Sequence, residues 1–417
     1  MIQVSDMSDK TRRHCMVVHA SYPIGEVRVQ REAEALIDHG YIVDIICLRL
    51  PGELAVDSYH GVNIYRLPVR RHKGSGALVQ LLEYLMFFTL AFLKLAALHL
   101  RWQYAVVQVH NLPDFLIFAA LFPKLTGCPI ILDLHDLMPE FFASRFNVSR
   151  SSLPLRLVYL QEQLACRFAD HVITVTEHWR QSLIQRGVPA GKCSVLMNLA
   201  DTRIFKKPVR TQPKPHDNDR FQLVYHGAIP RRYGLDLVVQ AIARVRAEIP
   251  GIHFTVIGRG EYLDELVRLT TELGLEAHVR FEKFMPVEDL PARIVTADLA
   301  VVPYRNDVFT NELLPTKLLE YAALGVPTIA SRTVGISAYF DETMVQFFTP
   351  GDVDELAQCI LKLYRNRSRL VALARSITRF DERFNWPDQR TSYLQLVDRL
   401  IERSQCPTLC DSEERLR

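Results

Sequence analysis

Short apolar runs recur along the chain and alternate with longer segments whose apolar residues follow the period of a helix. An apolar run bounded by turn residues predicts a strand buried on both faces, and strands that alternate with helices predict a parallel α/β sheet. In the first half we expect such strands at 15–20, 41–48, 104–110, 129–136, 169–176 and 192–198. In the second half we expect them at 221–227, 252–258, 279–281, 298–304, 328–331 and 346–348. Two separate series of strands predict two α/β domains.

A segment without apolar periodicity separates the two series. It covers 206–220 and is rich in Pro, Lys, Asp and Asn, a composition typical of a linker. At 417 residues the chain is too long for one ordinary core and suits two domains. The predicted organisation is a first domain at 1–205, the linker at 206–220, a second domain at 221–385, a C-terminal helix at 386–404 and a loose tail at 405–417.

The most informative local pattern is a short helix expected at 315–324. Pro315 suits the first position of a helix, where its missing N–H would be unpaired in any case. Gly325, with a proline two residues later, is a signal for the end of a helix. Glu320 therefore lies on the second turn of this helix, whereas Glu312 precedes the helix in a loop.

The start of this helix has the features of an anion site. The residue before Pro315 is Leu314, which has no side-chain oxygen to cap the first turn. The backbone N–H groups of Thr316 and Lys317 are therefore left for water or for a ligand, and the positive end of the helix dipole beside Lys317 suits a phosphate. On spacing alone, an ordinary surface helix between two buried strands fits the pattern equally well.

Polar clusters follow two predicted strands of the first domain. One cluster is His110, Asn111 and Asp114, and the other is His135, Asp136 and Glu140. In open α/β sheets, ligands bind beyond the carboxyl ends of the strands. A single histidine is usually structural, but two clusters at strand ends indicate a ligand-binding cleft. In the second domain, Arg231 and Arg232 open a helix after a glycine-containing strand end, which indicates a diphosphate site.

A long apolar segment at 77–100 follows a basic run at 66–73. Its length approaches that of a membrane span, but Glu83 and Lys94 would then lie deep in the hydrocarbon. A helix in a membrane interface, with the basic run meeting anionic headgroups, fits better. The alternative is a helix packed into the core, with the basic residues forming a solvated face.

Composition narrows the class of protein and its compartment. A hydrophobic content of 48% with 23% charged residues is typical of a globular protein, and a net charge of +3 is too small to indicate a nucleic-acid partner. Eight scattered cysteines without a CxxC pattern indicate free thiols in a reducing compartment. The first residues contain no apolar stretch of the kind found in signal peptides, so we expect a cytoplasmic protein that contacts the cytoplasmic face of the membrane peripherally.

The segment around the short helix resembles a known family. Glu312 and Glu320 in the spacing Glu-x7-Glu, with Pro-Thr-Lys-Leu-Leu-Glu-Tyr and Gly-Val-Pro-Thr-Ile-Ala-Ser, are similar to the donor-site signature of retaining glycosyltransferases of family GT4. The resemblance implies an α/β fold of the GT-B type, in which two Rossmann-like, doubly wound domains face each other across a cleft. It also implies that Glu312 lies by the hydroxyls of the transferred sugar and that Glu320 holds the ribose hydroxyls of the nucleotide.

The resemblance extends to other motifs. The segment Asp-Leu-His-Asp-Leu-Met-Pro-Glu is similar to the motif whose histidine points at the donor, a role that falls on His135. Arg-Val-x-x-Glu-Ala resembles the acceptor-side loop and places Arg28 there, although an exposed helix arginine is an equally good interpretation. Many GT4 sequences carry Arg-Lys-Gly where this chain has Arg232-Tyr233-Gly234, so Arg232 is the main candidate cation and Arg231 the second.

These patterns together give a set of candidate residues. The catalytic candidates are His135, Glu312 and Arg232. The donor-binding candidates are Arg231, Arg232, Gly258, Phe284, Leu314, Thr316, Lys317 and Glu320. The acceptor-side candidates are Gly25, Arg28, His110, Asn111, Asp114, Asp136 and Glu140.

The implied reaction moves a sugar from a nucleotide-sugar donor to a glycan or lipid-linked acceptor in the biosynthesis of cell-surface polysaccharides or glycoconjugates. We expect no cofactor and no metal, with cationic side chains and the helix N-terminus meeting the phosphate charge. Two alternatives remain open. One is a sugar-nucleotide epimerase of the same fold, and the other is an inactive scaffold in a glycan-assembly complex.

Overall fold

The computed structural model describes residues 12–23, 26–71, 76–146, 148–149, 151–206 and 220–405. The candidate Gly25, most of the predicted linker and the predicted tail beyond 405 lie outside the described residues. The chain divides into two compact units. Unit 1 comprises residues 1–197 with 387–417, and unit 2 comprises residues 198–386.

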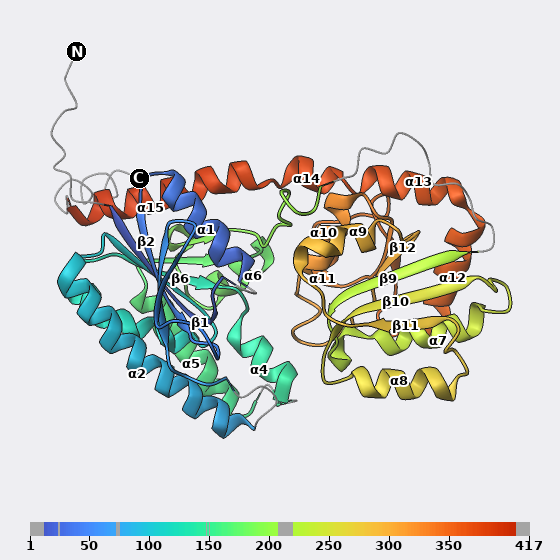
Figure 1. Cartoon of the computed structure of the whole chain (residues 1–417), viewed down its shortest axis with the longest axis horizontal. Coiled ribbons are helices and arrows are strands. Elements are labelled where there is room, and N and C mark those ends of the chain that lie inside the picture. Colours follow the sequence, from blue (N-terminus) through green and yellow to red (C-terminus); the bar gives the residue numbers. More distant parts are fainter. Residues whose placement is uncertain are drawn as a thin grey trace, which may run out of the picture. The chain divides into compact units, whose positions relative to one another are not determined.

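The described part of unit 1 is built around an eight-stranded sheet in the order β3-β4-β2-β1-β5-β6-β7-β8 (Figure 1). The strands are β1 (Arg13–Ser21), β2 (Ile42–Leu48), β3 (Val56–Tyr59), β4 (Val62–Leu67), β5 (Val106–His110), β6 (Ile130–Leu134), β7 (His171–Thr174) and β8 (Cys193–Val195). Strand β3 pairs antiparallel with β4, whereas the other neighbours pair parallel. The strand order reverses between β1 and β5, which is where doubly wound folds bind ligands.

Helices cover both faces of this sheet, which explains why β5 and β6 are buried along their whole length. The helices of unit 1 are α1 (Val27–Asp38), α2 (Ala77–Trp102), η1 (Asp114–Ala120), α3 (Leu121–Leu125), α4 (Met138–Phe146), α5 (Leu153–Phe168), α6 (Glu177–Gln185), η2 (Ala190–Lys192) and α15 (Trp386–Gln405). Right-handed crossovers place α2, η1 and α5 on one face, and η1 contacts both of the other two. The same rule places α1 on the opposite face.

The C-terminal helix α15 packs on unit 1 through two tyrosines from different elements. The hydroxyl of Tyr393 on α15 donates to the Oε1 atom of Gln108 at 2.7 Å, and the hydroxyl of Tyr41 donates to Asp398 on α15 at 2.6 Å. Both tyrosine side chains are buried. A helix that follows unit 2 in sequence therefore contributes to the packing of unit 1.

The described part of unit 2 contains a six-stranded parallel sheet in the order β11-β10-β9-β12-β13-β14. The strands are β9 (Phe221–Ala228), β10 (Ile252–Arg259), β11 (Val279–Glu282), β12 (Leu299–Val302), β13 (Thr328–Ser331) and β14 (Gln346–Phe348). In chain order this is 3-2-1-4-5-6, the Rossmann arrangement, with its switch point between β9 and β12. The two predicted doubly wound domains are thus confirmed.

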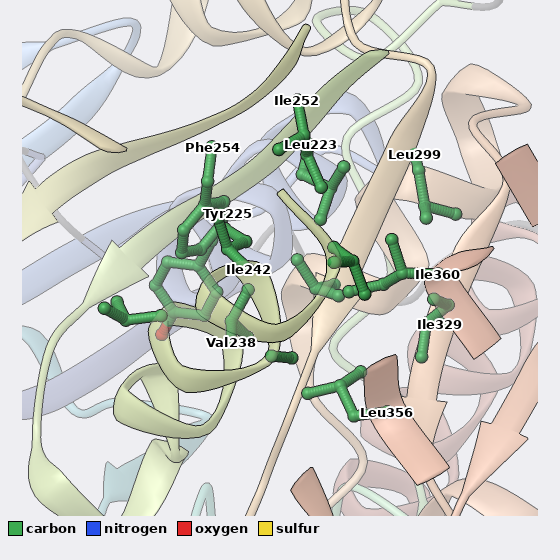
Figure 2. Close-up of a cluster of buried hydrophobic side chains, with 14 of the residues drawn as sticks. Leu223, Tyr225, Val238, Ile242, Ile252, Phe254, Leu299, Ile329, Leu356 and Ile360 are labelled. Carbon is green, nitrogen blue, oxygen red and sulfur yellow. The ribbon is translucent and has the colours of Figure 1, made fainter. Parts of the chain in front are cut away.

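The core of unit 2 lies between its sheet and the helices α7 and α12 (Figure 2). The helices of this unit are η3 (Arg231–Tyr233), α7 (Leu235–Val245), α8 (Leu263–Glu272), η4 (Val287–Asp289), α9 (Leu290–Ile294), α10 (Thr316–Leu324), α11 (Val334–Ser337), α12 (Val353–Arg365), α13 (Arg367–Ser376) and α14 (Arg379–Arg383). Phe254, Val238 and Ile360 are fully buried here. Each such side chain contributes roughly 1.5–3 kcal/mol by leaving water.

Two sequence predictions need adjustment. Pro315 is the N-cap of α10 in an extended conformation, so the helix begins one residue later than expected. The helix ends at Gly325 in the left-handed conformation, as the stop signal predicts. Arg231 and Arg232 lie in the short 3-10 turn η3 that precedes α7, and not in the first turn of α7 itself.

Candidate functional site

The candidate donor site in unit 2 begins at α10, which follows β12 at the switch point of the sheet. In the described part of the chain no side chain caps this helix, as the sequence predicts from Leu314. Leu314 itself is buried. The first turn of α10 therefore presents its backbone N–H groups and the positive end of the helix dipole, an arrangement suited to a phosphate.

Glu320 has a partner that the sequence analysis missed. Its carboxylate contacts the Nε2 atom of His226, which lies two residues before the end of β9 and is almost completely buried. The other ring nitrogen of His226 lies 3.0 Å from the hydroxyl of Tyr321. The position of His226 at a strand end was the available signal, the same one that singled out His110 and His135. With His226 in contact with its carboxylate, the Glu320 side chain remains 19% exposed to solvent.

Lys317 is enclosed by tyrosines. Its Nζ atom donates to the hydroxyl of Tyr304 at 2.7 Å and lies 4.7 Å and 5.1 Å from the ring centroids of Tyr233 and Tyr225. Burial lowers the pKa of Lys317 to about 8, although the nearby charge of Glu320 acts in the opposite direction. Tyr233, which stands where many relatives have lysine, thus packs beside the ammonium of a lysine from another element.

Backbone contacts that only glycine permits fix the loops of this site. A Cβ atom on Gly234 would lie 2.1 Å from the carbonyl oxygen of Pro303, and one on Gly258 would lie 2.0 Å from that of Gly227. A Cβ atom on Gly335 would meet the carbonyl oxygen of Glu312 at 2.6 Å. Gly258 therefore serves close strand packing, and the Glu312 loop rests directly on the backbone of α11.

The remaining donor-site candidates lie at the surface of unit 2. Arg231 is exposed, whereas Arg232 is half-buried with its guanidinium 5.6 Å from the ring of Phe309. Phe284 is 61% exposed, and the guanidinium of Arg259 lies 4.6 Å from its ring. An aromatic ring exposed beside a cation can stack on a planar base, which agrees with the predicted contact of this segment with the nucleotide.

Unit 1 holds a buried cluster of charges beside its switch point. Arg28 on α1 donates to both oxygens of Asp133 on β6, at 2.9 and 2.7 Å. The same carboxylate lies 3.0 Å from the Nδ1 atom of His110 and 3.4 Å from the Nε2 atom of His135. Arg28 is 5% exposed, so it is not the exposed helix arginine that one interpretation expected.

The electrostatics of this cluster favour a protonated His135. Burial opposes the charge on Asp133, but the guanidinium of Arg28 and the two histidines hold the pKa of that carboxyl well below its usual range. Burial likewise lowers the pKa of His135, but the Asp133 carboxylate outweighs it and raises the pKa. His110 has its pKa lowered to about 4 by burial and is therefore neutral at physiological pH. His135 is the exposed end of the cluster, with 17% of its side chain accessible.

The other predicted acceptor-side residues shape the loop that carries His135. Asn111 accepts from the backbone N–H of His135 at 2.8 Å and donates to Asp114 at 2.9 Å and to the carbonyl of Asp136 at 2.6 Å. His110 and Asp114 are fully buried, and Asn111 is nearly so. Their burial does not fit the direct acceptor contacts predicted for them, and the structure assigns them to positioning.

Glu140 is also engaged within the unit. It contacts Arg186, which donates to Glu162 at 2.9 Å, and all three side chains are largely buried. Burial raises the pKa of Glu162 to about 8 and that of Asp114 to about 7. Arg186 thus contacts two carboxyl groups, Glu140 and Glu162, and burial favours the neutral form of Glu162. Glu140 fits a structural role better than the predicted acceptor contact.

The ligand atoms of His110, Asp133 and His135 lie within 4.8 Å of one another, a spacing that a metal ion could bridge. Arg28, however, already donates to both oxygens of Asp133 in a desolvated environment. A divalent cation there would face a buried guanidinium a few ångströms away, with little water to screen the repulsion. The geometry therefore fits a hydrogen-bonded ion pair better than a metal site.

Comparison with known proteins agrees with this organisation. The family model described as glycosyl transferase 4-like domain matches residues 25–198, and the model described as glycosyl transferases group 1 matches residues 207–379. The chain belongs to the GT4-type glycosyltransferases. In this GT4-type chain, the glycosyl transferase 4-like model covers most of unit 1. The group 1 model covers α10 and the other elements of unit 2 that carry donor-site candidates.

A GDP-mannose-dependent phosphatidylinositol monomannoside mannosyltransferase from Mycolicibacterium smegmatis is 31% identical over 215 residues, 49% of this chain. The match covers 56% of that protein, so the chain spans about half the length of this curated relative. A 2-deoxystreptamine glucosyltransferase from Streptomyces kanamyceticus is 23% identical over 84% of this chain and 92% of its own length. Relatives named as transferases do not favour the epimerase or scaffold alternatives for this GT4-type chain.

Solved structures show the same fold. Sucrose-phosphate synthase from Thermosynechococcus elongatus superposes with a TM-score of 0.73 over 94% of this chain and 99% of that chain, at 19% identity. Anabaena HepE in complex with UDP-glucose superposes with a TM-score of 0.69 over 93% and 99%, at 18% identity. At such identities the likeness concerns the fold alone, and it confirms the GT-B arrangement of two Rossmann-like α/β domains expected for the GT4 type.

Proposed function

We propose that the protein is a glycosyltransferase that moves a sugar from a nucleoside-diphosphate sugar to a glycan or lipid-linked acceptor. The observation that carries this proposal is the uncapped start of α10 at the switch point of unit 2, with Lys317 and Glu320 beside it. These groups match the parts of a nucleotide sugar. The helix end and the lysine suit the diphosphate, and the carboxylate suits the ribose hydroxyls.

In the proposed reaction, stabilisation of the departing nucleoside diphosphate is the main catalytic effect. The helix N-terminus, Arg232 and Lys317 carry the positive charge for this step, so we propose that the reaction needs no metal. Glu312 orients the hydroxyls of the transferred sugar. His135 is the catalytic candidate of unit 1, and the acceptor attacks from the face that the nucleotide leaves. The configuration of the sugar is then retained.

The donor is a sugar linked to a nucleoside diphosphate, and the similar proteins support this class. One curated relative is named as GDP-mannose-dependent, and one solved structure of the same fold contains UDP-glucose. A thermal-shift panel of UDP-, GDP-, ADP- and dTDP-sugars, with EDTA present throughout, tests the proposal. We expect one nucleotide to raise the melting temperature, because a ligand that binds only the folded state stabilises it by mass action. A panel with no shift for any nucleotide would contradict the assignment of the donor site.

Glu320→Gln is expected to weaken donor binding by about tenfold or more, because the amide replaces charge-assisted hydrogen bonds to ribose with neutral ones. The matched control is Glu342→Gln, an exposed glutamate of unit 2 that contacts Arg332. Isothermal titration with the nucleotide identified in the panel measures both variants. Equal affinities for Glu320→Gln and wild type would remove Glu320 from the donor site.

We also propose peripheral contact with an anionic membrane at the cytoplasmic face, through α2 and α5. Helix α2 is long and apolar enough to cross a membrane, yet only 28% of its most apolar window is buried. Its two charged residues before the last turn point inward, since Glu83 lies 3.2 Å from His19 of β1 and the Lys94 ammonium lies 4.7 Å from the ring of Tyr65. These contacts hold α2 on the domain as a surface helix.

The outward faces of α2 and α5 together form an apolar surface on one side of unit 1. On α2 the exposed large apolar residues are Leu78, Val79, Leu81, Leu82, Leu85, Met86, Leu93, Leu100 and Trp102. On α5 they are Leu153, Leu157, Leu160 and Leu164, a stripe at helical spacing. Exposed Arg70 and Arg71 flank one end of α2, and exposed Arg101 flanks the other. Arg66 does not join them, because it is buried against Asp57 and Glu53.

Leu82→Ser together with Leu93→Ser and Leu157→Ser is expected to weaken binding to phosphatidylglycerol vesicles by roughly tenfold or more, because these side chains no longer enter the apolar interface. Leu54, Val267 and Val371 are exposed outside this surface and provide the matched triple control. Co-sedimentation at low and physiological salt measures both. Unchanged sedimentation of the first triple variant would exclude this surface as the membrane contact.

A further inference from the structure

The C-terminal helix is linked to the His135 cluster by a chain of buried hydrogen bonds. Tyr393 on α15 is 2% exposed, and its hydroxyl donates to the Oε1 atom of Gln108 at 2.7 Å. Gln108 lies in the middle of β5 and is fully buried. The amide of Gln108 is therefore oriented by a hydroxyl from a helix that lies more than two hundred residues further along the chain.

The other end of the Gln108 amide faces two carboxyl groups. Its Nε2 atom donates to Glu32 on α1 at 2.7 Å and lies 3.5 Å from the Oδ2 atom of Asp133. Glu32 is 3.1 Å from the guanidinium of Arg28, which also holds Asp133. Asp133 in turn contacts His135. An unbroken series of contacts thus runs from α15 through β5 and α1 to the histidine at the end of β6.

We propose that Tyr393 is a positioning residue for His135, acting by fixing the Gln108 amide so that it keeps its contacts with Glu32 and Asp133. The contribution of His135 to sugar transfer rests on the proposed function. The link from Tyr393 to His135 rests on the contacts alone.

The groups that face His135 come from several elements. They are Asp133 on β6, His110 on β5, Arg28 and Glu32 on α1, and Glu26, which precedes α1. Burial and the charge of Asp133 raise the pKa of Glu32 to about 8, so Glu32 is only partly ionised near neutral pH, and the hydrogen bond that Gln108 donates favours its ionised form. Any change that neutralises Glu32 removes negative charge near His135 and lowers the pKa of the histidine.

Loss of the Tyr393 hydroxyl favours the neutral form of Glu32 and thereby lowers the pKa of His135. The carbonyl of Gln108 would lose its donor in a fully buried site, which is unfavourable. Turning the amide relieves this only by directing a carbonyl oxygen at Glu32, and a carboxyl group facing that oxygen must be protonated to donate to it. In the turned arrangement Glu32 loses the interaction that favours its ionised form.

Tyr393→Phe tests the proposal, with Tyr41→Phe as the matched control. Tyr41 also donates from a buried hydroxyl to α15, but its acceptor is Asp398, and no contact among the described residues joins Asp398 to the His135 cluster. The full-length protein is labelled on histidine, and the pKa of each ring is followed by NMR in the absence of substrate. The signal of His135 is assigned from its loss in His135→Gln.

We expect the pKa of His135 to fall by about half a unit in Tyr393→Phe and to stay at the wild-type value in Tyr41→Phe. An unchanged His135 titration in Tyr393→Phe overturns the proposal. Equal shifts in both variants also overturn it, because they would mean that the docking of α15 in general, and not Tyr393, determines the pKa of His135. The measurement uses no donor, so failure to find sugar transfer would contradict the proposed function and leave this result intact.

Discussion

Asp133→Asn is expected to lower the free energy of unfolding by about 3 kcal/mol and to remove most sugar-transfer activity, because it leaves the buried guanidinium of Arg28 without its main counter-charge. Glu32 lies 3.1 Å from Arg28 and can take over part of the charge, which places the effect at the lower end of the range for broken buried pairs. His135 loses its carboxylate partner at the same time. Its pKa then falls, since burial alone disfavours the imidazolium.

A second buried arginine–aspartate pair in the same sheet provides the control. Arg13 donates to both oxygens of Asp44 at 2.8 and 2.9 Å, and Asp44 is fully buried. Among the described residues, Asp44 has no contact with the His135 cluster. Asp44→Asn should therefore cause a similar loss of stability in urea unfolding while activity per folded molecule stays near wild type. If both variants lost activity equally, the effect of Asp133→Asn would reflect a general loosening of unit 1.

Lys317→Met is expected to stabilise the protein by about 1–2 kcal/mol at pH 7 and to weaken donor binding by at least about tenfold. Burial lowers the pKa of Lys317 to about 8 in the folded state, whereas an unfolded lysine titrates near its usual value of about 10.4. Between these values the unfolded chain binds more protons, so the stability of wild type rises with pH in that interval. Below pH 8 the full penalty of the buried ammonium is present. Methionine removes that penalty, and the loss of the hydrogen bond to Tyr304 offsets part of the gain.

Two pH series check this prediction. Urea unfolding of wild type between pH 7 and pH 10.5 should show stability rising with pH, and this component should be absent in Lys317→Met. Donor affinity of wild type should fall as pH rises through about 8, where the ammonium loses its proton. Lys362→Met, an exposed lysine on α12, should change neither series. A destabilised Lys317→Met would mean that the tyrosine enclosure favours the cation more than burial disfavours it.

Local patterns in the sequence were enough to predict the strands of both sheets other than β3 and β4, and the limits of α10 to within one residue. Apolar runs, and the glycines and prolines that end them, can be recognised from a few neighbouring residues. The partners of the charged groups cannot be recognised in this way, because they lie far away in the sequence. Asp133 lies within the apolar run Ile-Ile-Leu-Asp-Leu, and its partner Arg28 is separated from it by 105 positions. Only the register of β5 and β6 with α1 beside them brings the two together.

The same reason explains why the burial of single residues was not predicted. Arg28 was assigned to the acceptor side from the family motif, and Asn111 and Asp114 from their places at a strand end, but all three side chains are buried. The tyrosines around Lys317 come from the end of β9, from η3 and from the segment after β12, so no spacing in the sequence relates them. The strands β3 and β4 were missed because β3 is exposed along its whole length and has no apolar run to mark it.

The contact between Gly335 and the Glu312 loop has a consequence for redesign of the enzyme. Any side chain at position 335 would push against the carbonyl oxygens of both Glu312 and Leu313, each 2.6 Å from the place of its Cβ atom. The loop cannot retreat freely, because Asn311 receives hydrogen bonds from the backbone of Val334 and Gly335. A mutant library that aims to change sugar preference should therefore keep position 335 fixed and vary the residues around it. Variants with a side chain at this position would displace Glu312, the carboxylate proposed to orient the transferred sugar.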